Sequence, residues 1–371
     1  AVLEEGAGAG IIVTASHNPR NWNALKFLNH RGEFISKAAG ENLLKLIEGG
    51  AIHFAEVDQL GQYRRREDAI EKHIDRILQL EWVDQMTIQE KQYTIVVDCI
   101  NSTGAISVPP LLEKFNCKII LLNGEVNGQF AHNPEPLPKN LLDLSKAVVA
   151  HGADLGIAVD PDVDRLALVS EDGSMFGEEY TLVAVADYVL QFNRGNTVSN
   201  LSSSRALRDV TRKYGGEYTA SAVGEVNVVA QMKAVDAVIG GEGNGGVIVP
   251  QLHYGRDALA GIALVLSHLA TSGKTLSELR QTYPDYHMVK DKIDLSPEIN
   301  MEEILKNLQA RFQNEKCNTI DGLKIDFENS WVHLRKSNTE PIIRIYAEST
   351  SSEEAKALVD TIRSEVNMIL S

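Results

Sequence analysis

Two short segments of this 371-residue chain carry side chains that could transfer a phosphate group. The first contains Ser16 within Thr-Ala-Ser-His-Asn-Pro, and the second reads Asp-Pro-Asp-Val-Asp-Arg over residues 160–165. A serine hydroxyl can carry a phosphate. Three carboxylates at every second position can bind one hard divalent cation, and Mg²⁺ is the first candidate. Phosphoryl transfer depends above all on positioning and charge neutralisation, and a metal beside a seryl phosphate would supply both.

Each segment also has an ordinary structural explanation. A serine before His-Asn-Pro is usually a turn or a helix cap. An isolated Asp-x-Asp-x-Asp is more often a solvated loop or a calcium loop. An EF-hand is excluded because its sixth position needs glycine, and Arg165 stands there.

The elements before the two segments favour a functional interpretation. Residues 155–159 are apolar and rich in β-branched side chains, which predicts a buried parallel strand. Asp160 would then follow the carboxyl end of that strand, where open α/β sheets bind ligands. Pro161 would lead the chain out of the sheet, and a second strand over 166–169 would close at the Asp172-Gly173 turn.

Ser16 has a similar context. Residues 10–14 form another apolar run that predicts a buried strand ending just before the serine. Lys26 follows ten residues after Ser16. It is either a surface lysine or a cation near the phosphate that exchanges a proton with a substrate hydroxyl.

Two further segments suit a polar, anionic ligand. Gly-Gly-Glu-Gly-Asn-Gly-Gly over 240–246 offers Glu242 and Asn244 to hydroxyl groups, although a flexible turn explains it equally well, and the spacing is not a nucleotide fingerprint. Arg-Lys-Ser-Asn-Thr-Glu-Pro over 335–341, followed by Arg344, suits a dianionic phosphate. A solvated basic turn is its ordinary alternative.

Together the four segments resemble the α-D-phosphohexomutase family, which includes phosphoglucomutases, phosphomannomutases and phosphoglucosamine mutases. The motifs Thr-Ala-Ser-His-Asn-Pro, Asp-Pro-Asp-x-Asp-Arg, Gly-Glu-x-x-Gly and Arg-x-Ser-Asn-Thr-Glu-Pro occur here in the family's order, and the resemblance covers essentially the whole chain. It implies an isomerase that interconverts a hexose 6-phosphate and a hexose 1-phosphate through a phosphoserine and a bisphosphorylated sugar.

The resemblance also implies a role for each motif residue. Ser16 would carry the phosphate, and Asp160, Asp162 and Asp164 would bind Mg²⁺ together with it. The residues flanking the reacting groups would be Lys26, a candidate general acid/base, and Arg165, while His17 and Asn18 would shape the serine loop. The sugar hydroxyls would meet Glu242 and Asn244, and the non-reacting phosphate would meet Arg335, Ser337, Asn338, Thr339 and Arg344.

The sequence departs from the family pattern in two places. The family has a Gly-Thr-Ser-Gly-x-Arg-Gly segment well before the serine loop, whereas here that loop begins at Thr14. We therefore expect a natural protein that extends further N-terminally, and an exposed sheet edge and apolar face in the first domain of these 371 residues. Many relatives have Ser-Gly-His where Asn244 and two glycines stand, so the sugar remains open between phosphoglucosamine, phosphomannose and phosphoglucose.

The expected fold is three related α/β domains with mixed sheets followed by a smaller α+β domain. The domain ranges are 1–88, 89–177, 178–285 and 286–371. The expected helices cover 68–80, 179–191, 258–271, 301–313 and a last one from 352. The expected strands cover 93–98, 322–327, 331–335 and 342–348.

Composition limits the partners. A net charge of −15 argues against nucleic acid and anionic membranes, and no apolar run reaches transmembrane length. The anionic substrate then requires a locally positive site. Cys99, Cys117 and Cys317 have neither metal-type nor disulfide-type spacing, which favours reduced thiols and a cytoplasmic protein. The resemblance implies a small-molecule sugar phosphate as the partner, and the oligomeric state stays open between a monomer and a homodimer.

Two other functions fit parts of the pattern. A strand followed by Asp160-x-Asp162 is similar to the nucleophile motif of haloacid-dehalogenase phosphatases, in which Asp160 would be the covalent carrier. That reading leaves Ser16 and the Arg335 segment unexplained. The other alternative is a relative that binds a sugar phosphate without turning it over.

Overall fold

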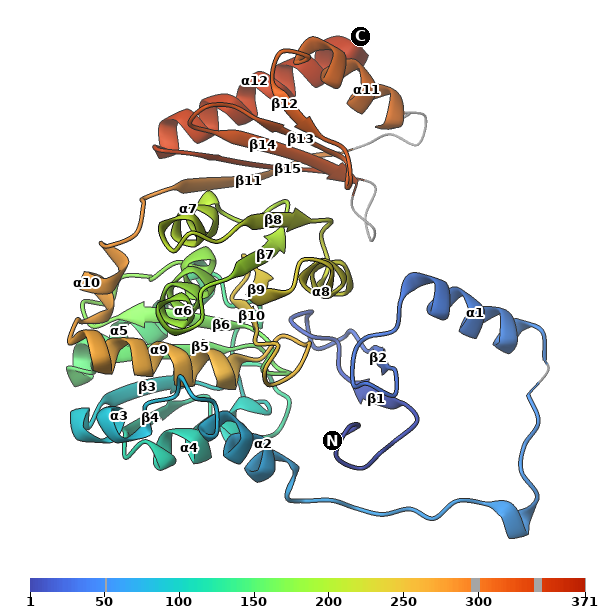
Figure 1. Ribbon diagram of the computed structural model, residues 1–371, viewed down its shortest axis with the longest axis vertical. Helices are drawn as coiled ribbons and strands as arrows, with labels where there is room; N and C mark the ends of the chain where they lie inside the picture. The colour runs from blue at the N-terminus through green and yellow to red at the C-terminus, as the bar shows by residue number, and fades with distance from the viewer. Residues whose placement is uncertain (51, 295–300, 337–341, 371) are drawn as a thin grey trace. The chain divides into compact units, whose positions relative to one another are not determined.

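The computed structural model describes residues 1–50, 52–294, 301–336 and 342–370. The chain forms two compact units (Figure 1). Unit 1 contains residues 1–177 and 246–276, and unit 2 contains residues 178–245 and 277–371. The four domain ranges expected from the sequence stay a prediction.

The centre of unit 1 is a four-stranded sheet in the order β4-β3-β5-β6. Its strands are β3 (Thr94–Asp98), β4 (Lys118–Leu122), β5 (Leu155–Val159) and β6 (Leu166–Ser170). Strand β3 pairs in parallel with β4 and β5, whereas β6 runs antiparallel to β5. All residues of β5 and β6 are buried, so the predicted strand before Asp160 and the strand after it are both confirmed.

Helices cover this sheet. Helix α5 (Leu142–His151) packs Leu144 and Val148 on the sheet residues Val96, Ala158 and Val169. Four other helices pack against one another: α2 (Ala69–Leu78), α3 (Gln85–Lys91), α4 (Gly104–Lys114) and α9 (Ala258–Ser272). Helix α9 follows the short strand β10 (Gly246–Ile248) and is buried over its first thirteen residues. Single helical turns lie at Val57–Gln59 and Pro138–Asn140.

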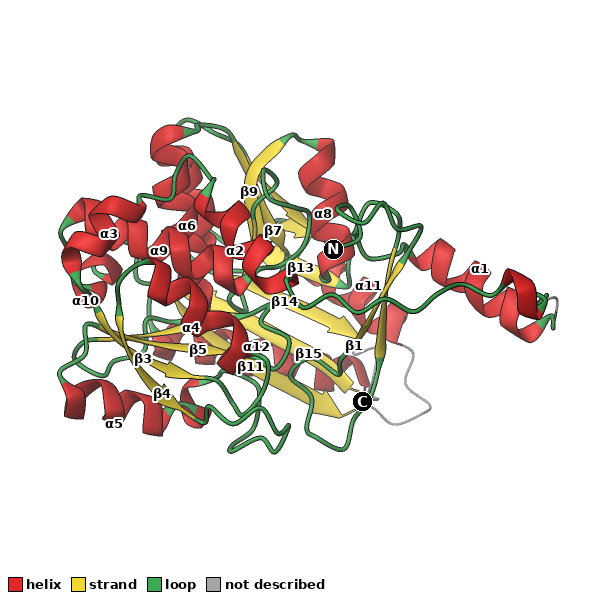
Figure 2. Cartoon of the chain, turned by 90° about the horizontal axis from the view of Figure 1, so that it is seen from below, coloured by secondary structure: helices red, strands yellow, loops and turns green. Residues whose placement is uncertain are grey.

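The first strand of the chain differs from its prediction. Within the described residues, strand β1 (Gly10–Val13) pairs only with β2 (Leu25–Leu28), as an antiparallel two-stranded sheet. The side chains of Ile11 and Val13 are 61% and 72% exposed, so the expected burial is wrong. An apolar run predicts a strand but does not determine how many elements cover it. Helix α1 (Lys37–Glu48) contributes no buried residue, and Figures 1 and 2 show it apart from the other helices of its unit.

Unit 2 begins with a parallel arrangement in which β7 lies between β8 and β9. The strands are β7 (Asn196–Asn200), β8 (Tyr218–Ser221) and β9 (Ala237–Glu242). The helices around them are α6 (Glu178–Phe192), α7 (Arg205–Lys213) and α8 (Glu225–Ala234). Helix α10 (Leu276–Arg280) leads into the last part of the chain.

The C-terminal part is an antiparallel sheet in the order β11-β15-β14-β13-β12 (Figure 1). The strands are β11 (His287–Asp294), β12 (Lys316–Asn318), β13 (Leu323–Asp326), β14 (Trp331–Lys336) and β15 (Ile342–Ser349). Helices α11 (Met301–Arg311) and α12 (Ser352–Leu370) share one apolar core with this sheet. The expected helices and strands here are therefore present, within a few residues at each end.

Among the helices in the described part of the chain, none has both the length and the apolar character needed to cross a bilayer.

Candidate active site

The segment after β5 folds around its own first carboxylate. Asp160 is fully buried, and its Oδ1 accepts the backbone N–H groups of Asp164 at 3.0 Å and Arg165 at 3.1 Å. Val163 closes the turn with its N–H on the Asp160 carbonyl oxygen at 3.0 Å. Its φ of +58° is an unusual conformation for a β-branched residue. We call residues 160–165 the metal loop.

The segment after β1, residues 14–19, is the serine loop. Ser16 has a φ of +52°, and its N–H donates to Thr14 Oγ1 at 2.9 Å. The amide of Asn18 donates to the Ala15 carbonyl oxygen at 2.9 Å. A left-handed conformation costs a residue with a side chain about 1–2 kcal/mol, and these local hydrogen bonds help to hold it.

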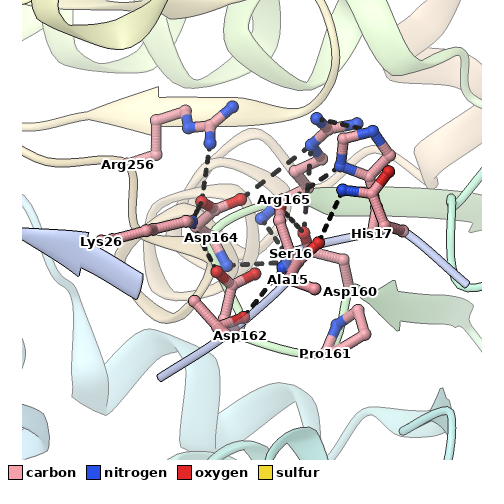
Figure 3. Close-up of polar contacts among 12 residues, drawn as sticks. Ala15, Ser16, His17, Lys26, Asp160, Pro161, Asp162, Asp164, Arg165 and Arg256 are labelled. Atoms are coloured by element: carbon pink, nitrogen blue, oxygen red, sulfur yellow. Dashed lines mark hydrogen bonds and ion pairs between the residues drawn. The ribbon is translucent and has the colours of Figure 1, made fainter. Parts of the chain in front are cut away.

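The two loops meet although 144 residues separate them (Figure 3). The Ser16 hydroxyl donates to Asp160 Oδ2 in a long contact of 3.5 Å. On its other side Ser16 Oγ lies 3.2 Å from Nδ1 of His17. The hydroxyl proposed as carrier thus lies at the edge of the carboxylate cluster.

The three carboxylates of the metal loop can reach one ion. One oxygen of each of Asp160, Asp162 and Asp164 lies within 4.8 Å of the others. The Oδ1 atoms of Asp162 and Asp164 are buried and accept no hydrogen bond from the residues that the structure describes. Buried carboxylate oxygens without donors fit a hard cation that prefers oxygen ligands.

Three basic side chains surround these carboxylates. Lys26 Nζ lies 2.6 Å from Asp162 Oδ2 and 3.2 Å from Asp164 Oδ2. Arg165 Nε lies 3.9 Å from Asp160 Oδ2. Arg256 Nη2 lies 2.7 Å from Asp164 Oδ2. The sequence interpretation missed Arg256, since nothing in its surroundings in the sequence links it to a loop 92 residues earlier.

These charges shift the ionisation of the site. Burial, followed by the charges of Asp164 and Asp162, raises the pKa of Asp160 well above its usual range. Burial alone would also raise the pKa of Asp164. The positive charges of Arg256, Lys26 and Arg165 have the larger effect, so the pKa of Asp164 is lowered. The pKa of Lys26 is raised despite its burial because Asp164 and Asp162 stabilise the ammonium form. Lys26 is therefore held in its ammonium form.

His17 is held neutral. Burial, with the charge of Arg165 as the next cause, lowers the pKa of His17 to about 4. Arg165 Nη2 lies 3.4 Å from His17 Nε2, and a guanidinium can only donate, so we assign the imidazole proton to Nδ1. In this tautomer Nδ1 donates to Ser16 Oγ, which leaves the serine proton directed at Asp160.

The candidate sugar residues lie at the end of β9 in unit 2. Glu242 is buried, and its Oε1 accepts from the Asn200 amide at 2.9 Å and from the Gly224 N–H at 3.2 Å. Asn244 follows two residues later. Between them, a Cβ on Gly243 would lie 1.8 Å from Oε2 of Glu179, so any other residue there would have to displace the Glu179 carboxylate.

Glu179 is a second residue that the sequence interpretation missed. Its Oε2 accepts the Ser204 N–H at 2.8 Å, and burial raises the pKa of its carboxyl well above its usual range. Its carboxylate bonds Ser204 and lies against Gly243, and one glutamate at the start of a helix gives no signal of that role in the sequence.

Of the candidate phosphate-binding residues, Ser337, Asn338 and Thr339 lie outside the described residues. Arg335 on β14 pairs directly with Arg344 on β15, which places their side chains on the same face of the sheet. Like charges in such a pair repel each other. Nε of Arg335 is buried and has no hydrogen-bond acceptor in the described part of the chain, so an anion here would be favourable.

Comparison with known proteins places the chain in a family. Four family models match it: phosphoglucomutase/phosphomannomutase α/β/α domain I over residues 1–51, domain II over 71–173, domain III over 177–286 and the C-terminal domain over 290–365. A probable phosphoglucosamine mutase of Methanopyrus kandleri is 34% identical over 97% of this chain and 79% of that protein. A phosphoglucomutase/phosphomannomutase of Thermococcus kodakarensis is 35% identical over 95% of this chain and 77% of its own length.

Solved structures agree with the sequence matches. A phosphoglucomutase/phosphomannomutase family protein of Burkholderia thailandensis superposes with a TM-score of 0.85 at 26% identity, over 98% of this chain and 77% of that one. The fold and these relatives define the class of the protein, which is a phosphohexomutase and hence an isomerase. The chain belongs to the phosphoglucomutase/phosphomannomutase family. The resemblance and the fold class expected from the sequence are thereby confirmed.

Proposed function

We propose that this protein interconverts the 6- and 1-phosphates of a hexose with Ser16 as the phosphate carrier. The observation that carries this proposal is the contact of Ser16 Oγ with Asp160 Oδ2 at the edge of the metal loop. In the first transfer, a free hydroxyl of the sugar attacks the phosphorus of phosphorylated Ser16. The bond from phosphorus to Ser16 Oγ breaks, and the sugar becomes bisphosphorylated. After the sugar turns, Ser16 takes up the other phosphate.

Lys26 is the proposed general acid/base of these transfers. An oxygen that loses its phosphoryl group develops negative charge and needs a proton, and the Lys26 ammonium beside Asp162 and Asp164 is a proton donor within the site. In the same transfer the resulting amine takes the proton that the attacking hydroxyl releases, which returns Lys26 to its ammonium form. Arg165 and Arg256 add positive charge where the phosphoryl group passes.

Mg²⁺ is the proposed cofactor, held by Asp160, Asp162, Asp164 and the oxygen of Ser16 or its phosphate. The support is the set of buried oxygens without donors at Asp162 and Asp164, within the described residues. When bound, such an ion polarises phosphoryl oxygens and neutralises the charge that the transfer develops.

The rest of the substrate is assigned to unit 2. Glu242 and Asn244 would hold sugar hydroxyls, and Arg335, Ser337, Asn338, Thr339 and Arg344 would bind the phosphate that is not reacting. The paired arginines on β14 and β15 favour a dianion there.

The preferred sugar is proposed from the relatives. They are named phosphoglucosamine mutase in Methanopyrus kandleri and phosphoglucomutase/phosphomannomutase in Thermococcus kodakarensis. We propose that the substrate is the phosphate of glucosamine, mannose or glucose. The ratio of kcat/KM for the three 1-phosphates decides between them. We further propose a cytoplasmic monomer or homodimer without nucleic-acid or membrane partners.

The carrier role is tested with Ser16→Ala. The variant should fold normally and retain less than about one hundredth of the turnover, because a hundredfold loss corresponds to only about 2.7 kcal/mol of barrier. Ser36→Ala is the matched control, since Ser36 caps α1 away from the site. Labelling with a radioactive hexose bisphosphate should give an acid-stable phosphoserine in the wild type. An acid-labile aspartyl phosphate, or turnover above one hundredth in Ser16→Ala, would reject the carrier role.

A further inference from the structure

A second group of ligand-type side chains lies in unit 1 outside the metal loop. It consists of His73 on α2, His253 between β10 and α9, and Asp257 at the N-cap of α9. One ligand atom of each lies within 4.8 Å of the others. The phosphoryl transfer proposed above uses none of the three.

The three side chains converge on one oxygen. Nε2 of His73 lies 2.7 Å and Nε2 of His253 lies 2.9 Å from Oδ2 of Asp257. The other oxygen, Oδ1, accepts the Ala260 N–H at 3.0 Å and so caps α9. Asp257 is buried at 6% exposure, while the two imidazoles are about one-third exposed. The carboxylate is thus fixed from inside, and the cluster opens to solvent on the histidine side.

This arrangement suits a borderline divalent ion. Two imidazole nitrogens and one carboxylate oxygen form a ligand set typical of Zn²⁺, with a fourth position left for water. Bond lengths of about 2.0–2.1 Å separate the ligands of a tetrahedral site by about 3.3 Å. The observed nitrogen-to-oxygen distances of 2.7 and 2.9 Å would have to open by about 0.4–0.6 Å, and the two imidazole nitrogens lie within 4.8 Å of each other.

Binding requires a change of proton position but no other reactant. Without an ion, each Nε2 carries a proton and donates it to Oδ2. With an ion, each imidazole keeps its single proton on Nδ1 and turns the Nε2 lone pair to the metal. Since both rings are partly exposed, solvent can exchange these protons.

The ligand chemistry separates this cluster from the metal loop. Three carboxylates prefer hard ions such as Mg²⁺, whereas imidazole prefers later transition ions. The cluster is also connected to the active site through the chain. Arg256 precedes Asp257 and contacts Asp164, and the Ala258 N–H donates to the Val163 carbonyl oxygen at 3.1 Å.

We propose that His73, His253 and Asp257 form a second cation site, selective for Zn²⁺ or a similar transition ion over Mg²⁺. The ion would tie α2 to the start of α9, and thereby hold the segment that carries Arg256. The proposal does not depend on the route of phosphate transfer.

The test is calorimetric titration of Zn²⁺ into the 371-residue protein in excess Mg²⁺. We expect one high-affinity equivalent per chain, weakened at least tenfold in both His73→Gln and His253→Gln. The control His151→Gln removes an exposed histidine at the end of α5 and should bind like the wild type. Unchanged affinity in both cluster variants, or no Zn²⁺ uptake by the wild type, overturns the proposal.

If a variant fails to fold, spectroscopy of the metal-loaded wild-type protein still identifies the ligands. Electron spin-echo spectroscopy of one equivalent of bound Cu²⁺ should detect two coordinated imidazoles. Co²⁺ should show visible d–d bands without a thiolate charge-transfer band. Fewer than two imidazoles, or a thiolate band that indicates cysteine ligands, would overturn the assignment.

Discussion

The serine loop and the metal loop place the proposed phosphate carrier beside the proposed metal ligands, but the two loops are supported in different ways. Each contains a residue with a side chain in the left-handed conformation, Ser16 in one and Val163 in the other. The metal loop follows β5, which is buried and lies between two strands, and it closes on a buried carboxylate. The serine loop follows β1, an exposed strand with one neighbour, and is held by short local hydrogen bonds.

The difference separates two requirements of the chemistry. Ligands of an ion must keep their geometry, which buried hydrogen bonds and a packed sheet provide. A phosphate carrier must exchange a bulky group, which a less buried loop permits. We therefore expect the metal loop to contribute to folding stability as well as to catalysis, and the serine loop to contribute mainly to catalysis.

Among these variants, Asp160→Ala should lower the free energy of unfolding most. The substitution leaves two buried N–H groups without their acceptor and should destabilise the protein by about 2–4 kcal/mol, partly offset by relief of repulsion among the carboxylates. Ser16→Ala should change stability by less than about 0.5 kcal/mol. Urea unfolding measures both.

Asp160→Asn separates the role of Asp160 as a hydrogen-bond acceptor from the role of its negative charge. It keeps an oxygen acceptor for the two N–H groups while weakening metal binding, so its stability should stay close to that of the wild type in the absence of metal. If Asp160→Ala is no less stable than Ser16→Ala, the proposed difference between the loops is wrong.

Binding of Mg²⁺ should stabilise the serine loop and the metal loop together. At one hundred times its dissociation constant, the ion should stabilise the folded protein by about 2.7 kcal/mol, and chelation should remove this gain together with activity. If phosphorylated Ser16 shares the ion, hydrogen exchange should slow in β1 and β2 as well as in the metal loop. Asp162→Asn should lose both effects. Protection of the metal loop alone would contradict a shared ion.

A pair of glycines tests the packing around each loop. A Cβ on Gly156 of β5 would lie 2.7 Å from Val148 Cγ2 and 3.1 Å from both Leu144 Cδ1 and Val169 Cβ. Overpacking of this kind costs about 1–3 kcal/mol. Gly10→Ala in β1 also meets a side chain at 2.7 Å, but that side chain is Val2, which is only partly buried and can move. Thermal unfolding should show that Gly10→Ala lowers the free energy of unfolding by less than half as much as Gly156→Ala.

The sequence predicted the part of the site that is local in the chain. A β-branched run followed by Asp160 indicated both the strand and the position of the carboxylates at its end. Ser16 was indicated by its motif, and Lys26 by its place ten residues later and by the family resemblance. Arg256 and Glu179 could not be found in this way, because each reaches its partner only through tertiary folding. The apolar run over residues 10–14 predicted a buried strand, which is wrong for β1, because such a run carries no information on what covers it. The exposed apolar face expected in the first domain agrees instead with the exposure of Ile11 and Val13.

The left-handed backbone conformations in the two loops could not be predicted from the sequence either. Glycine is the usual signal of a left-handed residue, and neither Ser16 nor Val163 provides it. Both conformations are imposed by hydrogen bonds that form only when the loop closes. Strain at a functional loop is therefore an outcome of the fold rather than of local preference.

The smallest expected effect concerns that strain. Val163→Gly removes a left-handed penalty of about 1–2 kcal/mol but adds about 0.5–1 kcal/mol of conformational freedom to the unfolded chain. Because Val163 is only partly buried, little packing is lost. The net change in the free energy of unfolding should be a gain between zero and about 1 kcal/mol, with Mg²⁺ affinity unchanged. Val163→Ala is the control: it keeps a Cβ, so the strain remains and no gain should appear. A loss above about 1 kcal/mol in Val163→Gly would mean that the valine side chain, rather than the hydrogen bonds to Asp160, holds the metal loop closed.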